Sequence, residues 1–352
     1  MYKLALIGAG RIGRIHATNA HAHSELALAY VVDPVCANAD AVCAATGAKR
    51  ATVDEVFEDS TVDGVVIASS TDTHLDYCLR ANGAGKAIFC EKPVDLDLGR
   101  AEGAEAQLAG ARLLVGFNRR FDPSFQRLKA MLAEGAVGRL ESLQITSNDP
   151  SPPPVSYVRV SGGLFVDMAI HDFDVSRWLL DEEPGEVFAW GSCLVDPEIG
   201  AAGDLDTART LLRTASGKLC VISNSRRSGF GYDQRIEAFG SAGMTCAKNV
   251  TTSTVEVWTE EGVRSDPFSN FFLDRYSVAY QAEMAHFADV LSGRRQPLVT
   301  FSDGVAALRL AVAATRSRET GAPVTIHPAG MRDAVCSHPG NSLKALPGLP
   351  GR

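Results

Sequence analysis

Gly8-Ala9-Gly10-Arg11-Ile12-Gly13 follows the apolar run Leu4-Ala5-Leu6-Ile7 near the start of a 352-residue chain. The spacing fits G-x-G-x-x-G between a predicted strand at 3–7 and a predicted helix at 11–22. In such a turn Gly8 permits the sharp bend, Gly10 lets a pyrophosphate approach the backbone, and Gly13 lets the helix pack closely on the strand. The helix N-terminus adds free N–H groups and a partial positive charge. We therefore predict a dinucleotide phosphate site here, to which Arg11 and Ile12 also contribute.

A carboxylate follows the second predicted strand, at 26–32. Asp33 lies 20 residues after Gly13, where a carboxylate accepts hydrogen bonds from the adenosine ribose hydroxyls. The same charge would repel a 2′-phosphate, so the pattern favours NAD over NADP. The structural alternative for Asp33 is a helix N-cap ahead of Pro34.

Strand and helix patterns alternate through residues 1–120. The predicted strands are nearly continuous apolar runs, which is typical of a parallel sheet covered on both faces. These strands lie at 3–7, 26–32, 64–68, 87–90 and 112–115, and the predicted helices at 11–22, 37–46, 72–84 and 96–108. We predict an α/β fold that begins with a doubly wound parallel sheet of the Rossmann type.

The pattern changes after residue 120. Several predicted strands follow one another with short loops, which favours an open, mostly antiparallel sheet in an α+β domain. These strands lie at 140–147, 187–195, 207–214, 218–225, 235–240 and 254–259, with helices at 123–134, 165–180, 277–291 and 302–319. We predict a nucleotide-binding domain at 1–120, a substrate-binding and oligomerisation domain at 121–328, and a flexible tail at 329–352.

Composition excludes several classes of partner. The chain has 34 Lys+Arg against 42 Asp+Glu, a net charge of −8 and no basic run, which argues against nucleic acid and acidic membranes. Its apolar runs fall far short of the roughly 20 residues of a membrane-spanning helix. Eight scattered cysteines without a C-x-x-C pair indicate reduced thiols, and hence a cytoplasmic protein.

Polar residues follow the third and fourth predicted strands, at the carboxyl edge where ligands bind in such sheets. We predict cofactor contacts from two groups there: Ser69, Thr71 and His74 after the third strand, and Glu91 and Lys92 after the fourth. The alternatives are helix caps for the hydroxyls, a packed side chain for His74 and an exposed charge for Lys92.

Three further motifs lie downstream: Glu91-Lys92-Pro93, Gly116-Phe117-Asn118-Arg119-Arg120-Phe121-Asp122-Pro123, and Val160-Ser161-Gly162-Gly163 with Asp167-x-x-x-His171. Together with the glycine turn, and over residues 1 to about 326, the chain resembles the glucose–fructose oxidoreductase and inositol 2-dehydrogenase family. Within that family it is most similar to the bacterial inositol 2-dehydrogenases. The resemblance implies NAD-dependent oxidation of a ring hydroxyl in a homotetramer built through the sheets. It also implies that Lys92 and His171 act at the reacting hydroxyl with Asp167 as their partner.

The residue types fit that chemistry on their own terms. Asp167 and His171 are four apart in the predicted helix at 165–180, which places them on one face. A carboxylate beside an imidazole stabilises the imidazolium that forms on taking a proton, and so raises its pKa. Lys92 would stabilise a developing alkoxide. The structural alternative is a weak i,i+4 surface pair. No second histidine stands at metal-ligand spacing, so we predict no metal.

A polyol needs several polar donors and acceptors around it rather than an apolar pocket. Besides Lys92 and His171, we predict substrate contacts from Arg120, Asp149, Tyr157 and Tyr232. The alternatives are a surface arginine and core tyrosines whose hydroxyls are satisfied within the protein.

The leading hypothesis is an NAD-dependent dehydrogenase that acts on a CH–OH group of a cyclic polyol, oxidising myo-inositol to 2-keto-myo-inositol (scyllo-inosose). His171 would accept the proton as the hydride leaves. One alternative is an NAD(P)-dependent dehydrogenase of a pyranose or anhydrosugar. A second is a non-catalytic nucleotide-binding regulator, because a fold alone does not establish turnover.

Overall fold

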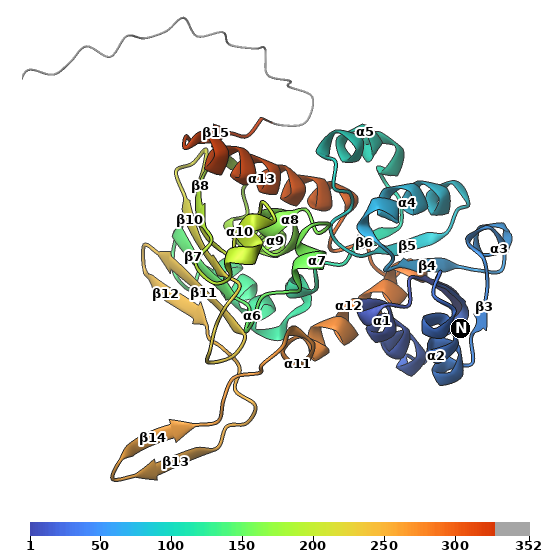
Figure 1. Ribbon diagram of the computed structural model, residues 1–352, viewed down its shortest axis with the longest axis horizontal. Coiled ribbons are helices and arrows are strands. Elements are labelled where there is room, and N and C mark those ends of the chain that lie inside the picture. Colours follow the sequence, from blue (N-terminus) through green and yellow to red (C-terminus); the bar gives the residue numbers. More distant parts are fainter. Residues whose placement is uncertain (328–352) are drawn as a thin grey trace, which may run out of the picture.

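The computed structural model describes residues 1–327; the tail predicted at 329–352 lies outside the described residues. Two sheets organise this part of the chain, and helices lie between them (Figure 1). Within residues 1–327, no helix is both long and apolar enough to cross a membrane.

The first sheet is parallel, with the order β3-β2-β1-β4-β5-β6. Its strands are β1 (Tyr2–Ile7), β2 (Leu26–Val32), β3 (Lys49–Arg50), β4 (Gly64–Ile67), β5 (Ala87–Cys90) and β6 (Leu113–Val115). The connecting helices are α1 (Arg11–Ala22), α2 (Cys36–Thr46), α3 (Val53–Glu58), η1 (Thr71–Thr73), α4 (His74–Gly83) and α5 (Leu98–Leu108). The order reverses between β1 and β4, which confirms the predicted doubly wound fold and places a ligand crevice at the carboxyl ends of these two strands.

The second sheet has the order β12-β11-β7-β10-β9-β8-β15 and is antiparallel except for the β7–β10 pair. The prediction of an open, mostly antiparallel sheet is therefore confirmed. Its strands are β7 (Leu140–Asn148), β8 (Pro184–Ser192), β9 (Thr207–Thr214), β10 (Leu219–Ser225), β11 (Asp233–Gly240), β12 (Gly243–Ala247) and β15 (Val324–Thr325).

The strand predicted at 254–259 does not join this sheet. Instead β13 (Glu256–Thr259) pairs only with β14 (Gly262–Ser265), as an exposed hairpin that projects from the body of the molecule (Figure 1). The prediction that this strand joins the large sheet was wrong. The alternation of residue types indicates a strand but does not indicate which strand it pairs with.

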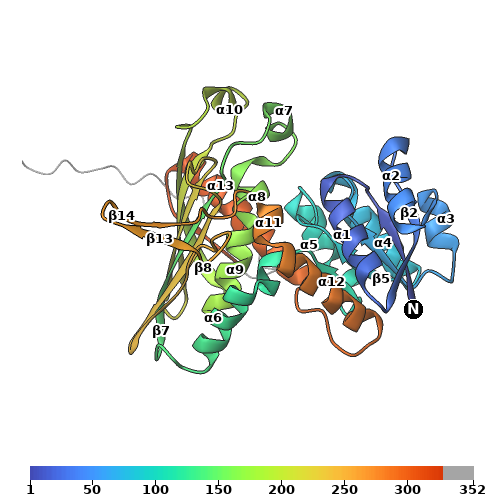
Figure 2. The same ribbon diagram turned by 90° about the horizontal axis from the view of Figure 1, so that it is seen from below.

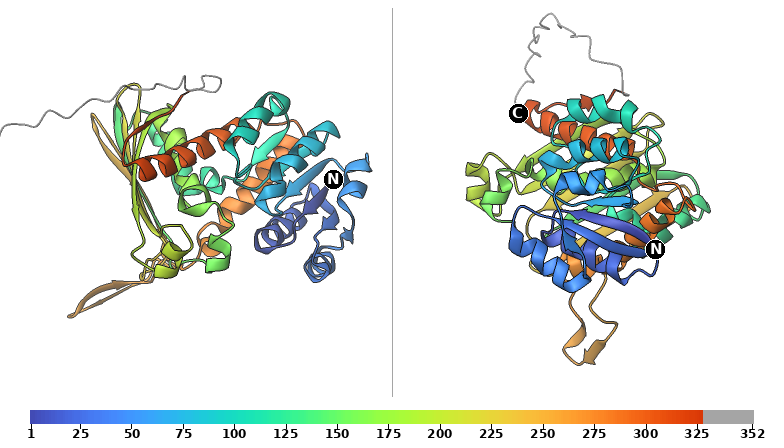
Figure 3. Two further views of the ribbon diagram at one scale, coloured as in Figure 1. Left: turned by 45° about the horizontal axis from the view of Figure 1, so that its top comes forward. Right: turned by 90° about the vertical axis from the view of Figure 1, so that its right-hand side faces the viewer.

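Within residues 1–327, helices cover only one face of the second sheet. In Figure 2, α6 (Pro123–Ala133), α9 (Ile170–Leu180) and α13 (Phe301–Thr320) lie between this sheet and the parallel sheet. Figure 3 shows α13 spanning from the second sheet to the neighbourhood of α5. Another long helix, α12 (Ser277–Leu291), returns to pack against α1. Short elements complete the domain: η2 (Asn118–Phe121), α7 (Val155–Val158), α8 (Gly163–Asp167), α10 (Pro197–Ala201) and α11 (Phe272–Arg275).

The helix predicted at 165–180 is interrupted, and α8 ends before α9 begins. The carbonyl of Leu164 accepts both the Met168 N–H, at 3.0 Å, and the Ala169 N–H, at 2.9 Å, so one extra residue occupies that turn. Asp167 and His171 therefore lie on different helices, and the predicted i,i+4 alignment was wrong.

Candidate active site

The glycine turn leaves open space in front of α1. Gly8 has φ +98°, and a Cβ there would lie 2.3 Å from the Ala68 carbonyl oxygen; a Cβ at Gly13 would lie 1.9 Å from the Gly8 oxygen. By contrast, a Cβ at Gly10 would meet nothing within 4 Å. No side chain caps the helix, and its first turn carries no acidic residue. The turn therefore fits a pyrophosphate seated on the free N–H groups of α1.

Asp33 holds the turn from the neighbouring strand. Its Oδ2 accepts the Ala9 N–H at 2.7 Å, and its Oδ1 accepts the Val35 N–H at 2.8 Å. The N-cap of α2 is Val35, so Asp33 is not the N-cap considered as its alternative. The carboxylate stands at the end of β2, where an adenosine ribose binds in this type of fold.

The side chains after β4 are bonded mainly to one another and to the backbone. Ser69 Oγ and Thr73 Oγ1 lie 2.7 Å apart, and Thr71 begins η1. His74 is buried, with Nδ1 2.8 Å from the Pro93 carbonyl oxygen and Nε2 3.1 Å from the Ser69 carbonyl oxygen. Both ring nitrogens are thus engaged by the backbone, so the ring joins two loops and cannot make the predicted cofactor contact.

Glu91 is similarly engaged within the protein. Its Oε1 lies 2.7 Å from His16 Nε2, and its Oε2 accepts the Lys92 N–H at 3.3 Å. Glu91 therefore links α1 to Lys92 and does not make the direct cofactor contact that was predicted for it.

Lys92 and Asp167 come together as predicted, although they stand 75 residues apart. The Lys92 ammonium donates to the Asp167 carbonyl oxygen at 2.8 Å and lies 3.8 Å from Asp167 Oδ1. Tyr157 donates its hydroxyl to the same Oδ1 at 2.8 Å. Arg226, which is almost fully buried, lies 3.4 Å from Asp167 Oδ2 and 3.6 Å from Asp204. One carboxylate thus holds the ammonium, a phenol and a guanidinium.

His171 stands beside this cluster without a bond to Asp167. Its ring packs edge-on against Phe117, with centroids 5.7 Å apart, and among the described residues its buried Nδ1 has no hydrogen-bond partner. Burial lowers the pKa of His171 well below 6.5, and the charges of Lys92 and Arg119 lower it further. The expectation that a carboxylate raises this pKa was wrong, because burial and two positive charges act on the ring.

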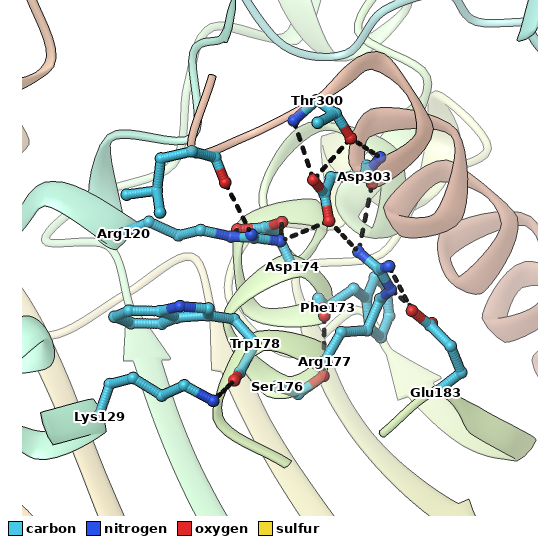
Figure 4. A network of polar contacts seen from close by, with 11 residues as sticks. Arg120, Lys129, Phe173, Asp174, Ser176, Arg177, Trp178, Glu183, Thr300 and Asp303 are labelled. Atoms are coloured by element: carbon cyan, nitrogen blue, oxygen red, sulfur yellow. Dashed lines mark hydrogen bonds and ion pairs between the residues drawn. The ribbon is translucent and has the colours of Figure 1, made fainter. Parts of the chain in front are cut away.

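Arg120 takes part in a separate network of ion pairs (Figure 4). Its guanidinium donates to both oxygens of Asp174, at 2.9 Å and 2.6 Å, and to Asp303 at 3.0 Å. Arg177 donates to the same Asp303 oxygen at 3.3 Å. With its donors occupied by buried carboxylates, Arg120 does not make the predicted substrate contact.

The adjacent arginine, Arg119, is the one that supports the cluster. It donates to Asp172 and, at 3.0 Å, to Ser147 Oγ, and Asn224 donates to the other Asp172 oxygen at 2.8 Å. Arg119, Asn224 and the buried Arg226 were not among the predicted site residues. The adjacent pair Arg119-Arg120 indicated a functional position, but the sequence does not show which of the two side chains points toward the site.

Two more predicted substrate residues lie close to these charges. Removal from water raises the pKa of Asp149 to about 6, opposed by Arg226 and Arg119 and reinforced by Asp167 and Asp172. Burial raises the pKa of Tyr232 well above 10, and Arg119 and Asp149 are among the groups that act on it. Asp149, Tyr157 and Tyr232 therefore share one neighbourhood with Lys92 and His171. Within residues 1–327, no three His, Cys, Asp or Glu side chains are grouped so as to hold a metal.

Comparison with known proteins agrees with this geometry. Residues 2–117 match the oxidoreductase family with an NAD-binding Rossmann fold, and residues 125–245 match the GFO/IDH/MocA C-terminal domain. The inositol 2-dehydrogenase of Rhizobium meliloti is 45% identical over 317 residues, which cover 90% of this chain and 96% of that protein. The chain belongs to the GFO/IDH/MocA oxidoreductase family. It is an oxidoreductase with an NAD-binding domain.

Solved structures extend the similarity to the whole fold. A myo-inositol dehydrogenase from Corynebacterium glutamicum has a TM-score of 0.89 and 42% identity, over 94% of this chain and 100% of that chain. A scyllo-inositol dehydrogenase from Lactobacillus casei, solved with NAD(H) and scyllo-inositol, has a TM-score of 0.85 and 30% identity, over 92% of this chain and 99% of that chain.

Proposed function

We propose that this oxidoreductase removes hydride from a ring hydroxyl carbon of a cyclic polyol, converting myo-inositol to 2-keto-myo-inositol with NAD as the cofactor. The observation that carries the proposal is the placement of the Lys92 ammonium beside a histidine whose pKa is depressed. The relatives named as inositol dehydrogenases support the choice of ring.

Each side chain has one task in this proposal. His171, uncharged at neutral pH, accepts the hydroxyl proton, and Lys92 stabilises the negative charge that develops on the oxygen. Asp167 holds the Lys92 ammonium in place, Tyr157 donates to the Asp167 carboxylate, and the buried Arg226 balances the Asp167 charge. NAD, when bound, supplies the hydride acceptor.

Binding is divided between the two parts of the chain. We propose that residues 1–120 hold NAD, through Gly8, Gly10, Arg11, Ile12, Gly13, Asp33, Ser69, Thr71 and Lys92. Residues 121–328 would hold the polyol, through Asp149, Tyr157, His171 and Tyr232. A homotetramer built through the outer face of the second sheet and a cytoplasmic location complete the proposal. All seven cysteines within residues 1–327 are free, which suits a reducing compartment.

The test is absorbance at the NADH band with NAD and myo-inositol, beside scyllo-inositol, glucose, xylose and an anhydrosugar. Turnover with myo-inositol supports the proposal. Turnover with a pyranose or anhydrosugar alone favours the sugar dehydrogenase, and no turnover with any ring and either NAD or NADP favours the regulator.

Lys92→Ala separates an enzyme from a regulator. Removing the ammonium should lower kcat by about 10²- to 10³-fold, the usual cost of losing one group that stabilises an oxyanion. NAD binding, measured by quenching of tryptophan fluorescence, should persist. Unchanged turnover would contradict the role given to Lys92.

A further inference from the structure

A buried polar cluster lies where α1 packs against α12, directly beneath the end of β5. It consists of His16 on α1, Glu91 after β5, and Tyr280 and Glu283 on α12. His16 is 1% exposed and Glu283 is 0% exposed. Neither the proposed chemistry nor the hydrophobic core explains four polar side chains in this place.

The imidazole of His16 is held in one orientation. Its ring packs against Phe89, with centroids 4.6 Å apart, and against Tyr280, at 5.9 Å. Nε2 lies 2.7 Å from Glu91 Oε1, whereas the buried Nδ1 has no partner among the described residues. A proton on Nδ1 would therefore be a buried, unpaired donor. This arrangement fits a neutral ring that donates Nε2–H to the ionised Glu91 carboxylate.

The second oxygen of Glu91 faces the catalytic loop. Oε2 accepts the Lys92 backbone N–H at 3.3 Å. Gly116, at the end of β6, closes the other side, because a Cβ there would lie 3.1 Å from the Glu91 carboxyl group. The carboxylate is thus held between α1, the end of β6 and Lys92.

We propose that His16 and Glu91 are positioning residues that join helix α1 to Lys92, so that the helix facing the cofactor pyrophosphate and the lysine facing the substrate move as one unit. The inference rests on the proposed function for the roles of α1 and Lys92. A misplacement of about 1 Å at a reacting group can cost about 10²-fold in rate, so a link of this kind matters even though neither residue touches a reactant.

The test uses Glu91→Gln, His16→Gln and the double variant. Glu91→Gln places an amide N–H group where the carboxylate accepted, and should lower kcat about 10- to 100-fold. The KM for NAD and the affinity for NADH should change less than about threefold. Because both residues form one link, the double variant should lose little more than the worse single variant.

Glu283→Gln is the matched control. Burial, with the nearby Glu91 charge, raises the pKa of Glu283 well above its usual range, and neither of its oxygens has a partner among the described residues. Since neither oxygen takes part in the link, the isosteric amide should keep kcat within about twofold. Three outcomes would each overturn the proposal. Glu91→Gln could keep the wild-type kcat, or Glu91→Gln and Glu283→Gln could lose kcat equally. Alternatively, the separate losses of Glu91→Gln and His16→Gln could multiply in the double variant.

A structural measurement separates this proposal from the function on which it rests. If the wild-type protein oxidises none of the rings tested, the proposed function fails, but crystal structures of Glu91→Gln and His16→Gln still locate Lys92. Displacement of its ammonium from the Asp167 carbonyl oxygen, against 2.8 Å here, would support positioning. An unmoved lysine in both variants would overturn it. If Glu91→Gln fails to fold, His16→Gln alone decides by the same criterion.

Discussion

The surroundings of His171 keep its imidazole uncharged at neutral pH, so the ring can accept a proton without a neighbouring carboxylate. Burial and the positive charges of Lys92 and Arg119 lower the pKa of His171 well below 6.5. The neutral form that accepts a proton predominates above that pKa and is lost as the pH falls through it. We therefore expect kcat/KM for oxidation to rise with pH below 6.5 and to be flat through neutral pH. A rising limb centred at or above 6.5 would contradict this assignment.

Asp149 supplies the control for that profile, because its pKa of about 6 adds a second titration. If its carboxylate accepts hydrogen bonds from the polyol, kcat/KM carries a limb near pH 6. Asp149→Asn should remove this limb and leave the one from His171. A primary isotope effect, measured alongside, shows whether hydride transfer limits the rate at each pH.

Single residues show how far the sequence reaches. Lys92 and Asp167 meet as their motifs predict, Lys92 from the loop after β5 and Asp167 from the end of α8. The choice of Arg120 over Arg119 was wrong because the two neighbours in η2 point to different carboxylates, and only tertiary packing decides between them. The buried Arg226 stands in none of the motifs from which the site was predicted.

At the scale of single elements, local chemistry predicted most helices. The helix predicted at 11–22 matches α1 in both of its bounds. The interruption between α8 and α9 could not be predicted, because it depends on two N–H groups sharing the Leu164 carbonyl. Residue periodicity within one segment does not report that choice.

The ion pairs of Figure 4 join three elements: η2, α9 and α13. Asp174→Asn should leave the buried Arg120 partly unpaired and lower the free energy of unfolding by about 3 kcal/mol. This lies at the low end for a broken buried pair because the amide oxygen still accepts one hydrogen bond. Urea denaturation followed by circular dichroism measures the change.

Glu183→Gln is the matched control for this network. Glu183 pairs with Arg177 from an exposed position, where an ion pair is worth less than about 1 kcal/mol. A loss for Asp174→Asn no larger than that for Glu183→Gln would mean that the network does not hold these elements together.

Across the whole molecule, the sequence predicted two sheets of the correct kind but not their strand order. The parallel pairing of β7 with β10 joins segments far apart in the chain, and local patterns carry no signal for it. The outer face of the second sheet carries no helix in the described part of the chain (Figure 2). The projecting hairpin β13–β14 likewise has a sequence signal for its strands but none for its position.

The outer face of the second sheet carries a row of apolar side chains across three strands. Phe188 on β8 pairs with Leu211 on β9, which pairs with Val221 on β10. Buried and exposed residues alternate along both strands, and Leu211 and Val221 lie on the exposed side. Their side chains are 42% and 41% exposed. Trp190 and Phe239 extend the exposed apolar surface. Apolar surface of this extent marks an interaction site, and a second copy of the same face would cover it.

Leu211→Glu tests that assembly directly. A carboxylate at the centre of the row would be buried without a partner in a face-to-face contact, so the assembly should dissociate to smaller species while each chain stays folded. Light scattering after size exclusion should show the mass of four chains for the wild type and less for the variant, with circular dichroism unchanged.

Val278→Glu, at a 55%-exposed apolar position on α12 away from the sheet, adds the same charge and should leave the mass unaltered. A wild-type mass of one chain would contradict assembly through this face, because the row would then be exposed to water in the native protein. Equal dissociation of both variants would mean that the added charge, and not its place on the sheet face, causes the dissociation. That result would also contradict assembly through this face.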